Sequence, residues 1–184
     1  MRWFPVLVSA LLASPLCAQQ PPQQPATSAT PAVPKFAPTN KDALKYRSGL
    51  AVPRFASLRS SRAYLRSGPG KEYPVLFVFI HPGTPLEVLA EWNVWRQVRD
   101  ADGTEGWMDR AMLSTERTVQ ITRSVRDLRA RPDLSAPVVL RAEPGVILRV
   151  TMCAEQWCRV EGEGRSGYLL RDQAFGVYPD ESIG

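Results

Sequence analysis

Short apolar or alternating runs, separated by turns rich in glycine and proline, make up the chain from residue 52 onwards. Tyr64 to Arg66 alternates and Pro74 to Ile80 is an apolar run. Three more short strand-like runs follow, at Leu86 to Leu89, Trp95 to Arg99 and Gly106 to Met108. The first alternating run and the apolar run are separated by Ser67-Gly68-Pro69-Gly70, which is a turn signal because glycine permits positive φ and proline fixes its own φ. Runs this short between such turns are typical of strands. We therefore predict an all-β fold.

The same pattern occurs twice. YLRSGPGKEYPVL occupies residues 64–76, and DLRARPDLSAPVV occupies residues 127–139. Later landmarks keep their order, since Trp157 corresponds to Trp95, and Gly167-Tyr168 corresponds to Gly106-Trp107. Because turn residues and apolar positions agree together, we predict two copies of one small β unit, at residues 52–115 and 116–184. Units of ~60 residues bury a limited core and commonly need a partner or a covalent staple.

The N-terminal part has a different character. Residues 1–18 combine Arg2, an apolar stretch and Leu16-Cys17-Ala18, which predicts a signal peptide cleaved near Ala18 and export to the periplasm. Cys17 raises the alternative of lipidation, but Leu16 precedes it where a small residue is usual. Residues 19–51 are rich in Pro, Gln and Ala and predict a disordered linker. No stretch approaches the ~20 apolar residues of a membrane span, so none is expected.

The formal net charge of +5 lies mainly in the linker. Residues 19–52 hold one anion, Asp42, against the cations Lys35, Lys41, Lys45 and Arg47. The two predicted β units are nearly neutral. A nucleic-acid binder concentrates positive charge on its folded surface, so we do not expect a nucleic-acid partner.

Catalytic chemistry has little support in the sequence. His81 is the one histidine and lies beside a Pro-Gly turn, so a nucleophile with a histidine base is not expected. Asp100, Asp102 and Glu105 lack the spacing of a calcium loop. We predict no enzyme activity, no metal and no cofactor.

Two cysteines remain after the signal peptide. Cys153 and Cys158 flank a predicted hairpin in the second unit. In an oxidising compartment, a disulfide between them is the leading interpretation. Metal binding would need more ligands, and the CxxxxC spacing differs from that of redox CxxC sites.

Aromatic residues gather in the first unit, and binding surfaces are enriched in tyrosine and tryptophan. Burial in a small barrel core is the alternative. We expect Trp92 to be exposed in a polar loop, Tyr73 and Trp107 to wall a groove, and Trp95 to lie in either the core or the groove. Arg66 beside Tyr64 would suit a ligand carboxylate. The candidate groove residues are thus Tyr64, Arg66, Tyr73, Trp92, Trp95 and Trp107.

Several motifs together resemble the bacterial SH3-like domain family, over residues 52–179. They are Leu65-Arg66-Ser67-Gly68-Pro69, Trp95-Arg96-Gln97-Val98, Asp102 to Trp107 and Trp157-Cys158-Arg159-Val160. The resemblance implies two small, bent β-barrels and a binding role, often towards peptidoglycan or a peptide, without chemistry of its own. The second copy departs from the pattern, since Arg131-Pro132 replaces Gly68-Pro69 and Tyr168 replaces Trp107. Whether that copy binds or only supports the first stays open.

The sequence thus predicts an exported, non-enzymatic binding module whose partner is cell-wall peptidoglycan or a peptide. The alternative is an envelope scaffold whose barrels bind another exported protein by edge-strand addition, without a groove ligand.

Overall fold

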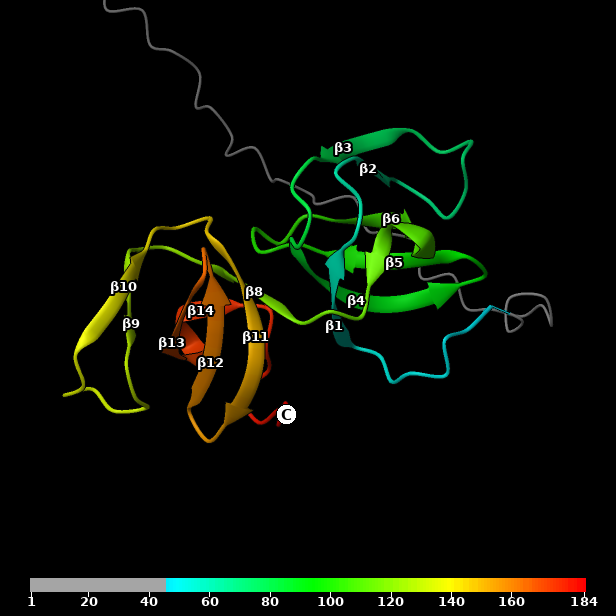
Figure 1. The fold of residues 1–184 in the computed structure, drawn as a ribbon. Helices are drawn as coiled ribbons and strands as arrows, with labels where there is room; N and C mark the ends of the chain where they lie inside the picture. Colours follow the sequence, from blue (N-terminus) through cyan, green and yellow to red (C-terminus); the bar gives the residue numbers. More distant parts are fainter. Residues whose placement is uncertain (1–45) are drawn as a thin grey trace, which may run out of the picture. The chain divides into compact units, whose positions relative to one another are not determined.

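The computed structural model describes residues 46–184. Two seven-stranded antiparallel sheets account for the regular structure in this part of the chain, and no α-helix occurs there (Figure 1). The prediction of an all-β fold built from two tandem SH3-like barrels is confirmed. The predicted signal peptide and most of the predicted linker lie outside the described residues.

The first sheet has the spatial order β3-β2-β6-β5-β4-β1-β7. Its strands are β1 (Arg54–Leu58), β2 (Ala63–Arg66), β3 (Val75–Phe79), β4 (Pro85–Trp92), β5 (Trp95–Arg99), β6 (Glu105–Asp109) and β7 (Leu113–Ser114), with a 3-10 turn at Arg110–Met112. The sequence pattern predicts β2 to β6 but does not reveal β1 and β7. Because β7 has two residues and pairs only with β1, no periodicity could show it.

The second sheet repeats this order strand for strand, as β10-β9-β13-β12-β11-β8-β14. Its strands are β8 (Thr118–Ile121), β9 (Arg126–Arg129), β10 (Val138–Ala142), β11 (Ile147–Ala154), β12 (Trp157–Gly162), β13 (Arg165–Leu170) and β14 (Ala174–Phe175), with a 3-10 turn at Arg171–Gln173. The long strands β4 and β11 each contain one register shift, after Val88 and Val150 respectively. Such bulges bend a strand, which allows a small sheet to curl around its own core.

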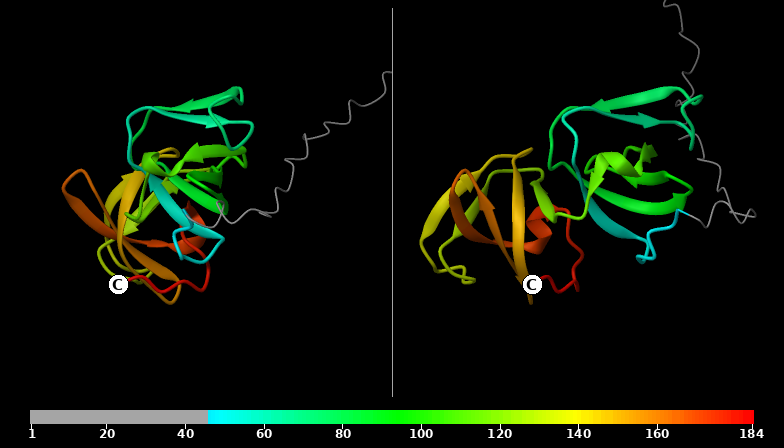
Figure 2. Two further views of the ribbon diagram at one scale, coloured as in Figure 1. Left: turned by 90° about the vertical axis from the view of Figure 1, so that its right-hand side faces the viewer. Right: turned by 45° about the vertical axis from the view of Figure 1, so that its right-hand side comes forward.

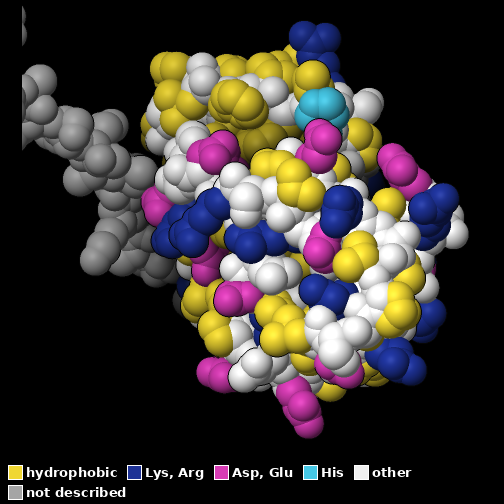
Figure 3. Space-filling model, turned by 90° about the vertical axis from the view of Figure 1, so that its left-hand side faces the viewer, with side chains coloured by type: hydrophobic (Ala, Val, Ile, Leu, Met, Phe, Trp, Pro, Cys, Tyr) yellow, Lys and Arg dark blue, Asp and Glu magenta, His cyan; other side chains and the backbone are white. Residues whose placement is uncertain are grey.

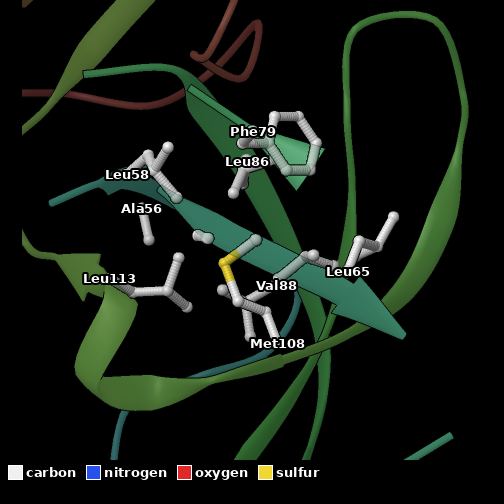
Figure 4. Packing of buried hydrophobic residues seen from close by; sticks show 10 residues of the cluster. Ala56, Leu58, Leu65, Phe79, Leu86, Val88, Met108 and Leu113 are labelled. Atoms are coloured by element: carbon white, nitrogen blue, oxygen red, sulfur yellow. The ribbon is translucent and has the colours of Figure 1, made fainter. Parts of the chain in front are cut away.

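Each barrel has its own core. The side chains of Leu65, Leu86, Val88 and Met108 are fully buried and meet inside the first barrel (Figure 4). Leu128, Leu148, Val160 and Leu169 do the same in the second barrel. Buried residues alternate with more exposed ones along strands such as β2 and β11, as expected for sheets with one face towards a core.

The predicted disulfide is confirmed. Cys153 and Cys158 lie directly opposite each other on β11 and β12 and are bonded. The chain end pairs with the same hairpin, because the backbone of Ile183 exchanges two hydrogen bonds with the backbone of Cys153.

Both barrels belong to one compact unit and are in direct contact. Phe55 of β1 packs against the rings of Phe175 and Tyr178, at centroid distances of 5.1 and 4.7 Å. The Tyr178 hydroxyl donates a hydrogen bond to Glu87 Oε1 at 2.9 Å. Burial, together with this bond to a carboxylate, raises the pKa of Tyr178. Aromatic packing therefore joins the two barrels.

Candidate functional site

Two of the predicted groove residues are buried. Trp107 is 2 % exposed and Trp95 is 9 % exposed. Trp107 lies on β6 in the interior of the sheet, opposite Gln97 on one neighbour and Arg66 on the other. A side chain so covered presents no surface to a ligand, so the structure corrects the assignment of Trp107 as a groove wall. Trp95, which we expected in either the core or the groove, is buried.

Arg66 has a structural task that the sequence did not reveal. Its Nη1 donates hydrogen bonds to the backbone oxygens of Tyr73 at 2.7 Å and Lys71 at 3.0 Å. In the second barrel, Arg129 Nη1 donates to the Ala136 oxygen at 2.8 Å in the same way. The arginine of the repeated Leu-Arg motif therefore braces the loop that follows it. One nitrogen of Arg66 is already engaged in this task.

Tyr73 and Trp92 are partly buried. The ring of Tyr73 lies against Gly68, where any added Cβ would overlap it. Tyr73 therefore packs within the loop that Arg66 braces. Trp92 lies at the end of β4, opposite Trp95 on β5, and is half-buried, whereas we expected it to be exposed.

Tyr64 is the one predicted groove residue that is well exposed, at 42 %. The guanidinium groups of Arg62 and Arg66 lie 5.8 and 5.9 Å from its ring centroid. Val78 of β3 lies directly opposite Tyr64. We call the surface formed by Arg62, Tyr64, Arg66 and Val78 the Tyr64 face.

The second barrel replaces this arrangement with an ion pair. Asp127 occupies the position of Tyr64, and Arg141 lies opposite it, as Val78 does in the first barrel. Arg141 Nε lies 3.1 Å from Asp127 Oδ1, and the arginine side chain is 74 % exposed. The aromatic surface is therefore confined to the first barrel.

A second surface, which the sequence analysis did not identify, lies at the edge strand β3. The hairpin of β2 and β3 forms one margin of the first barrel (Figure 2). Beside it is a cavity of about 540 Å³. We call it the β3 hollow; its lining includes Phe77, Ile80, Asp100, Asp102, Gln120 and Ile147. Figure 3 shows hydrophobic side chains gathered around the single histidine, with acidic side chains close by.

A buried ionic cluster holds residues 46–48, which the sequence analysis assigned to the linker. Glu91 accepts hydrogen bonds from Ser48 Oγ at 2.7 Å and from Ser48 N at 2.9 Å. It also pairs with Arg54 at 2.7 Å and with the buried Arg96 at 3.2 Å. Arg96 in turn donates to the Tyr46 backbone oxygen. The ordered structure therefore begins before residue 52, because buried charged groups of the barrel take partners from this segment.

Opposing effects act on the pKa of Glu91. Burial raises this pKa, but the hydrogen bonds from Ser48 and Arg54 and the charge of Arg96 outweigh burial and lower it. The cluster therefore stabilises the fold with an ionised carboxylate. The polar groups of Glu91, Arg54 and Arg96 bind partners within the cluster.

The described residues contain neither a metal-ligand cluster nor a membrane-spanning helix. No group of three or more His, Cys, Asp or Glu side chains is placed to hold a metal ion. Nor does this part of the chain contain a helix long and apolar enough to cross a membrane.

Fold and surfaces together define a pair of tandem small β-barrels with an aromatic face and an apolar edge in the first copy. A family model for the bacterial SH3 domain matches residues 59–115 and 126–172. The chain belongs to this family, which confirms the resemblance seen in the sequence. No curated protein matches the chain.

Among solved structures, NlpC1 and NlpC2 from Trichomonas vaginalis match with 12 % and 13 % identity and TM-scores of 0.31 and 0.33. Each alignment covers 72 % of this chain, and 49 % and 51 % of those chains, respectively. An NlpC/P60 family protein from Bacillus cereus matches with 14 % identity and a TM-score of 0.30, over 71 % of this chain and 58 % of that one. The chain thus spans about half the length of these proteins.

Proposed function

We propose that the chain is an exported, non-enzymatic binding module of the periplasm that recognises peptidoglycan or its peptide. Membership of the bacterial SH3 domain family supports a binding role. The proposed export rests on the signal-peptide pattern of residues 1–18. The observation that carries the proposed binding site is the exposed Tyr64 ring, with the guanidinium groups of Arg62 and Arg66 close to it.

The Tyr64 face has chemistry suited to such a ligand. An exposed tyrosine offers a large contact area at low cost in side-chain entropy. Arg62 forms no ion pair within residues 46–184 and is exposed, so its guanidinium is available for the carboxylates of a peptide stem. Arg66 contributes its remaining nitrogens while Nη1 braces the loop. The ligand contact is therefore assigned to Tyr64 and Arg62, with Arg66 as support.

Retention of the purified mature chain on isolated peptidoglycan sacculi tests this function. We expect the wild type to be retained and Tyr64→Ala and Arg62→Ala to lose most of the retention. Asp127→Ala is the matched control, because Asp127 holds the position of Tyr64 in the second barrel. Absence of wild-type retention contradicts the function, and equal retention of all variants contradicts the site.

The proposed lack of catalysis has its own test. Incubating the chain with sacculi should release no more soluble wall fragments than buffer alone. Release that increases with protein concentration would overturn a purely binding role.

A second candidate function is binding of another exported protein. The observation that favours it is the apolar and unpaired edge of β3, since an exposed edge strand is a template for a strand from another chain.

A further inference from the structure

The backbone of β3 has a free side. β3 is the terminal strand of its sheet and pairs with β2 alone. Within the described residues, no other strand covers its outer edge. Edge strands in natural proteins are usually protected by charged side chains, proline, bulges or covering loops, because their free N–H and C=O groups attract other strands.

The side chains of β3 carry no charge, although Pro74 precedes the strand and its register with β2 shifts between Phe77 and Val75. Residues 74–80 read PVLFVFI and contain no charged residue. Val75, Leu76, Phe77 and Ile80 are nevertheless 42 to 60 % exposed. Apolar residues exposed together in this way mark interaction surfaces. The edge therefore has both the backbone groups and the side chains that a partner strand would use.

The equivalent strand of the second barrel is an internal comparison. β10 is also terminal in its sheet, but it carries Arg141, which is highly exposed and pairs with Asp127. Its exposed apolar residues are Val138 at 40 % and Val139 at 36 %. One copy thus has a charge on its edge strand and the other has none. The fold alone does not require an apolar edge, so the bare β3 belongs to the first copy specifically.

The β3 hollow supplies a pocket beside this edge. Phe77 and Phe79 pack with ring centroids 4.9 Å apart and form one apolar wall, and Ile147 of the second barrel also lines the cavity. A strand added to β3 directs alternate side chains to one face of the sheet. The cavity volume of about 540 Å³ accommodates such side chains.

The opposite lining is acidic. Asp100 and Asp102 line the hollow and form no ion pair within residues 46–184. The neighbouring cation, Arg99, pairs with Glu87 and Glu105 instead. Asp100 Oδ1 accepts the backbone N–H groups of Asp102 and Thr104, which holds the turn in place. An adjoining depression that shares Asp102 contains one cation, Arg123, and one further anion, Asp172. The net charge favours a cationic ligand group at the hollow.

We propose that the β3 hollow binds an extended, largely apolar segment of a partner protein, which adds as a strand to β3 and places a Lys or Arg opposite Asp100 and Asp102. This inference rests on the second candidate function and specifies its site and its partner chemistry. The hollow and the Tyr64 face share Val78 but differ in their other residues. Phe77 lies opposite the fully buried Leu65, whose neighbour Tyr64 points to the other face of β2.

Selection from a phage-displayed library of random short peptides tests this proposal with the full mature chain as bait. We expect enrichment of peptides with alternating apolar residues and one Lys or Arg. The consensus peptide is then synthesised, and its affinity is measured by fluorescence anisotropy. Absence of enrichment, or enrichment of acidic peptides, would overturn the proposal.

Three protein variants locate the site. Phe77→Lys should weaken the consensus peptide at least about tenfold. Asp102→Asn should weaken it several-fold, with a difference that shrinks as salt is added, because exposed charges are screened. Val139→Lys places the same charge on β10 and should leave the affinity unchanged. Equal affinity of wild type and Phe77→Lys, with thermal midpoints showing both folded, contradicts the site.

Two further measurements separate this proposal from neighbouring ones. Two N-methylated peptides, one with the odd and one with the even nitrogens methylated, test the ladder. If the peptide adds as a strand, the peptide whose methylated nitrogens face β3 should lose binding, because its ladder hydrogen bonds are blocked, and the other should keep it. Unchanged binding of both peptides contradicts strand addition. Retention on sacculi should be the same for Phe77→Lys and wild type. If Phe77→Lys instead loses sacculus retention, the hollow takes a wall ligand and the protein-partner assignment is refuted.

Discussion

Replacing Glu91 with Gln removes one charge from the buried cluster with almost no change of shape. The Glu91 side chain is 6 % exposed and contacts Arg54 and the 3 % exposed Arg96. Gln keeps one acceptor oxygen for Ser48 but leaves both guanidinium groups without their counter-charge. Breaking a buried ion pair by removing one partner costs about 3–5 kcal/mol. We expect a loss of about 3 kcal/mol in the free energy of unfolding, near the lower limit because one acceptor remains.

Asp127→Asn is the matched control. It removes the same kind of charge from a pair whose arginine, Arg141, is 74 % exposed. Exposed pairs contribute about 0–1 kcal/mol, so this variant should change stability little. Urea unfolding followed by tryptophan fluorescence measures both variants, because Trp92, Trp95 and Trp107 report on the first barrel and Trp157 reports on the second. If Glu91→Gln costs no more than Asp127→Asn, the cluster does not stabilise the barrel as argued.

The same cluster predicts a dependence on acid. Because the pKa of Glu91 is below its ordinary value of 4.5 in the folded state, the unfolded chain binds the proton more readily. The contribution of Glu91 is therefore complete above pH 4.5 and is lost as the pH falls through the lowered pKa. Wild type should lose stability in this acid range, and Glu91→Gln should lose less. Glu181, whose pKa is also lowered, should keep part of the effect in the variant.

Three further perturbations test the remaining parts of the fold. Reducing the disulfide between Cys153 and Cys158 should lower the free energy of unfolding by about 2 kcal/mol, measured in urea with and without reductant; an unchanged midpoint would contradict this. Phe55→Ala should cost about 3 kcal/mol and separate the unfolding of the two barrels in calorimetry, whereas an unaltered single transition would argue against aromatic coupling. Gly106→Ala puts a Cβ 2.6 Å from Leu65 Cγ, so urea unfolding should show a loss of about 1–3 kcal/mol, and a neutral result would refute the overlap.

Local signals were enough to predict most of the architecture. Strand runs and glycine-proline turns are short-range features, so β2 to β6 could be located in the sequence. The repeat predicted the second barrel, and the two cysteines predicted their disulfide. The short strand β7 could not be predicted from local signals. It has two residues, too few to show an alternating pattern, and it is defined by its pairing with β1.

The candidate site was harder to predict, because exposure depends on which strands lie beside a residue. Trp107 and Tyr64 are both aromatic residues in short strands, yet one is 2 % and the other 42 % exposed. Trp107 lies between two neighbouring strands in the sheet interior, whereas Tyr64 lies near its margin. Arg66 was expected to meet a ligand, but loop closure brings the Tyr73 carbonyl to its Nη1.

By itself, the sequence determined the all-β class, the duplication, the near neutrality of the folded units and the pairing of the cysteines, because each depends on residues close in the chain or on the repeat. Tertiary structure alone decided that β3 would be an edge with apolar residues exposed, and that Asp100 and Asp102 would line the same cavity as Phe77. The apolar run at residues 74–80 could equally have been a buried central strand. Its position at the end of the sheet order leaves its outer edge unpaired, and that edge is the basis of the proposed partner surface.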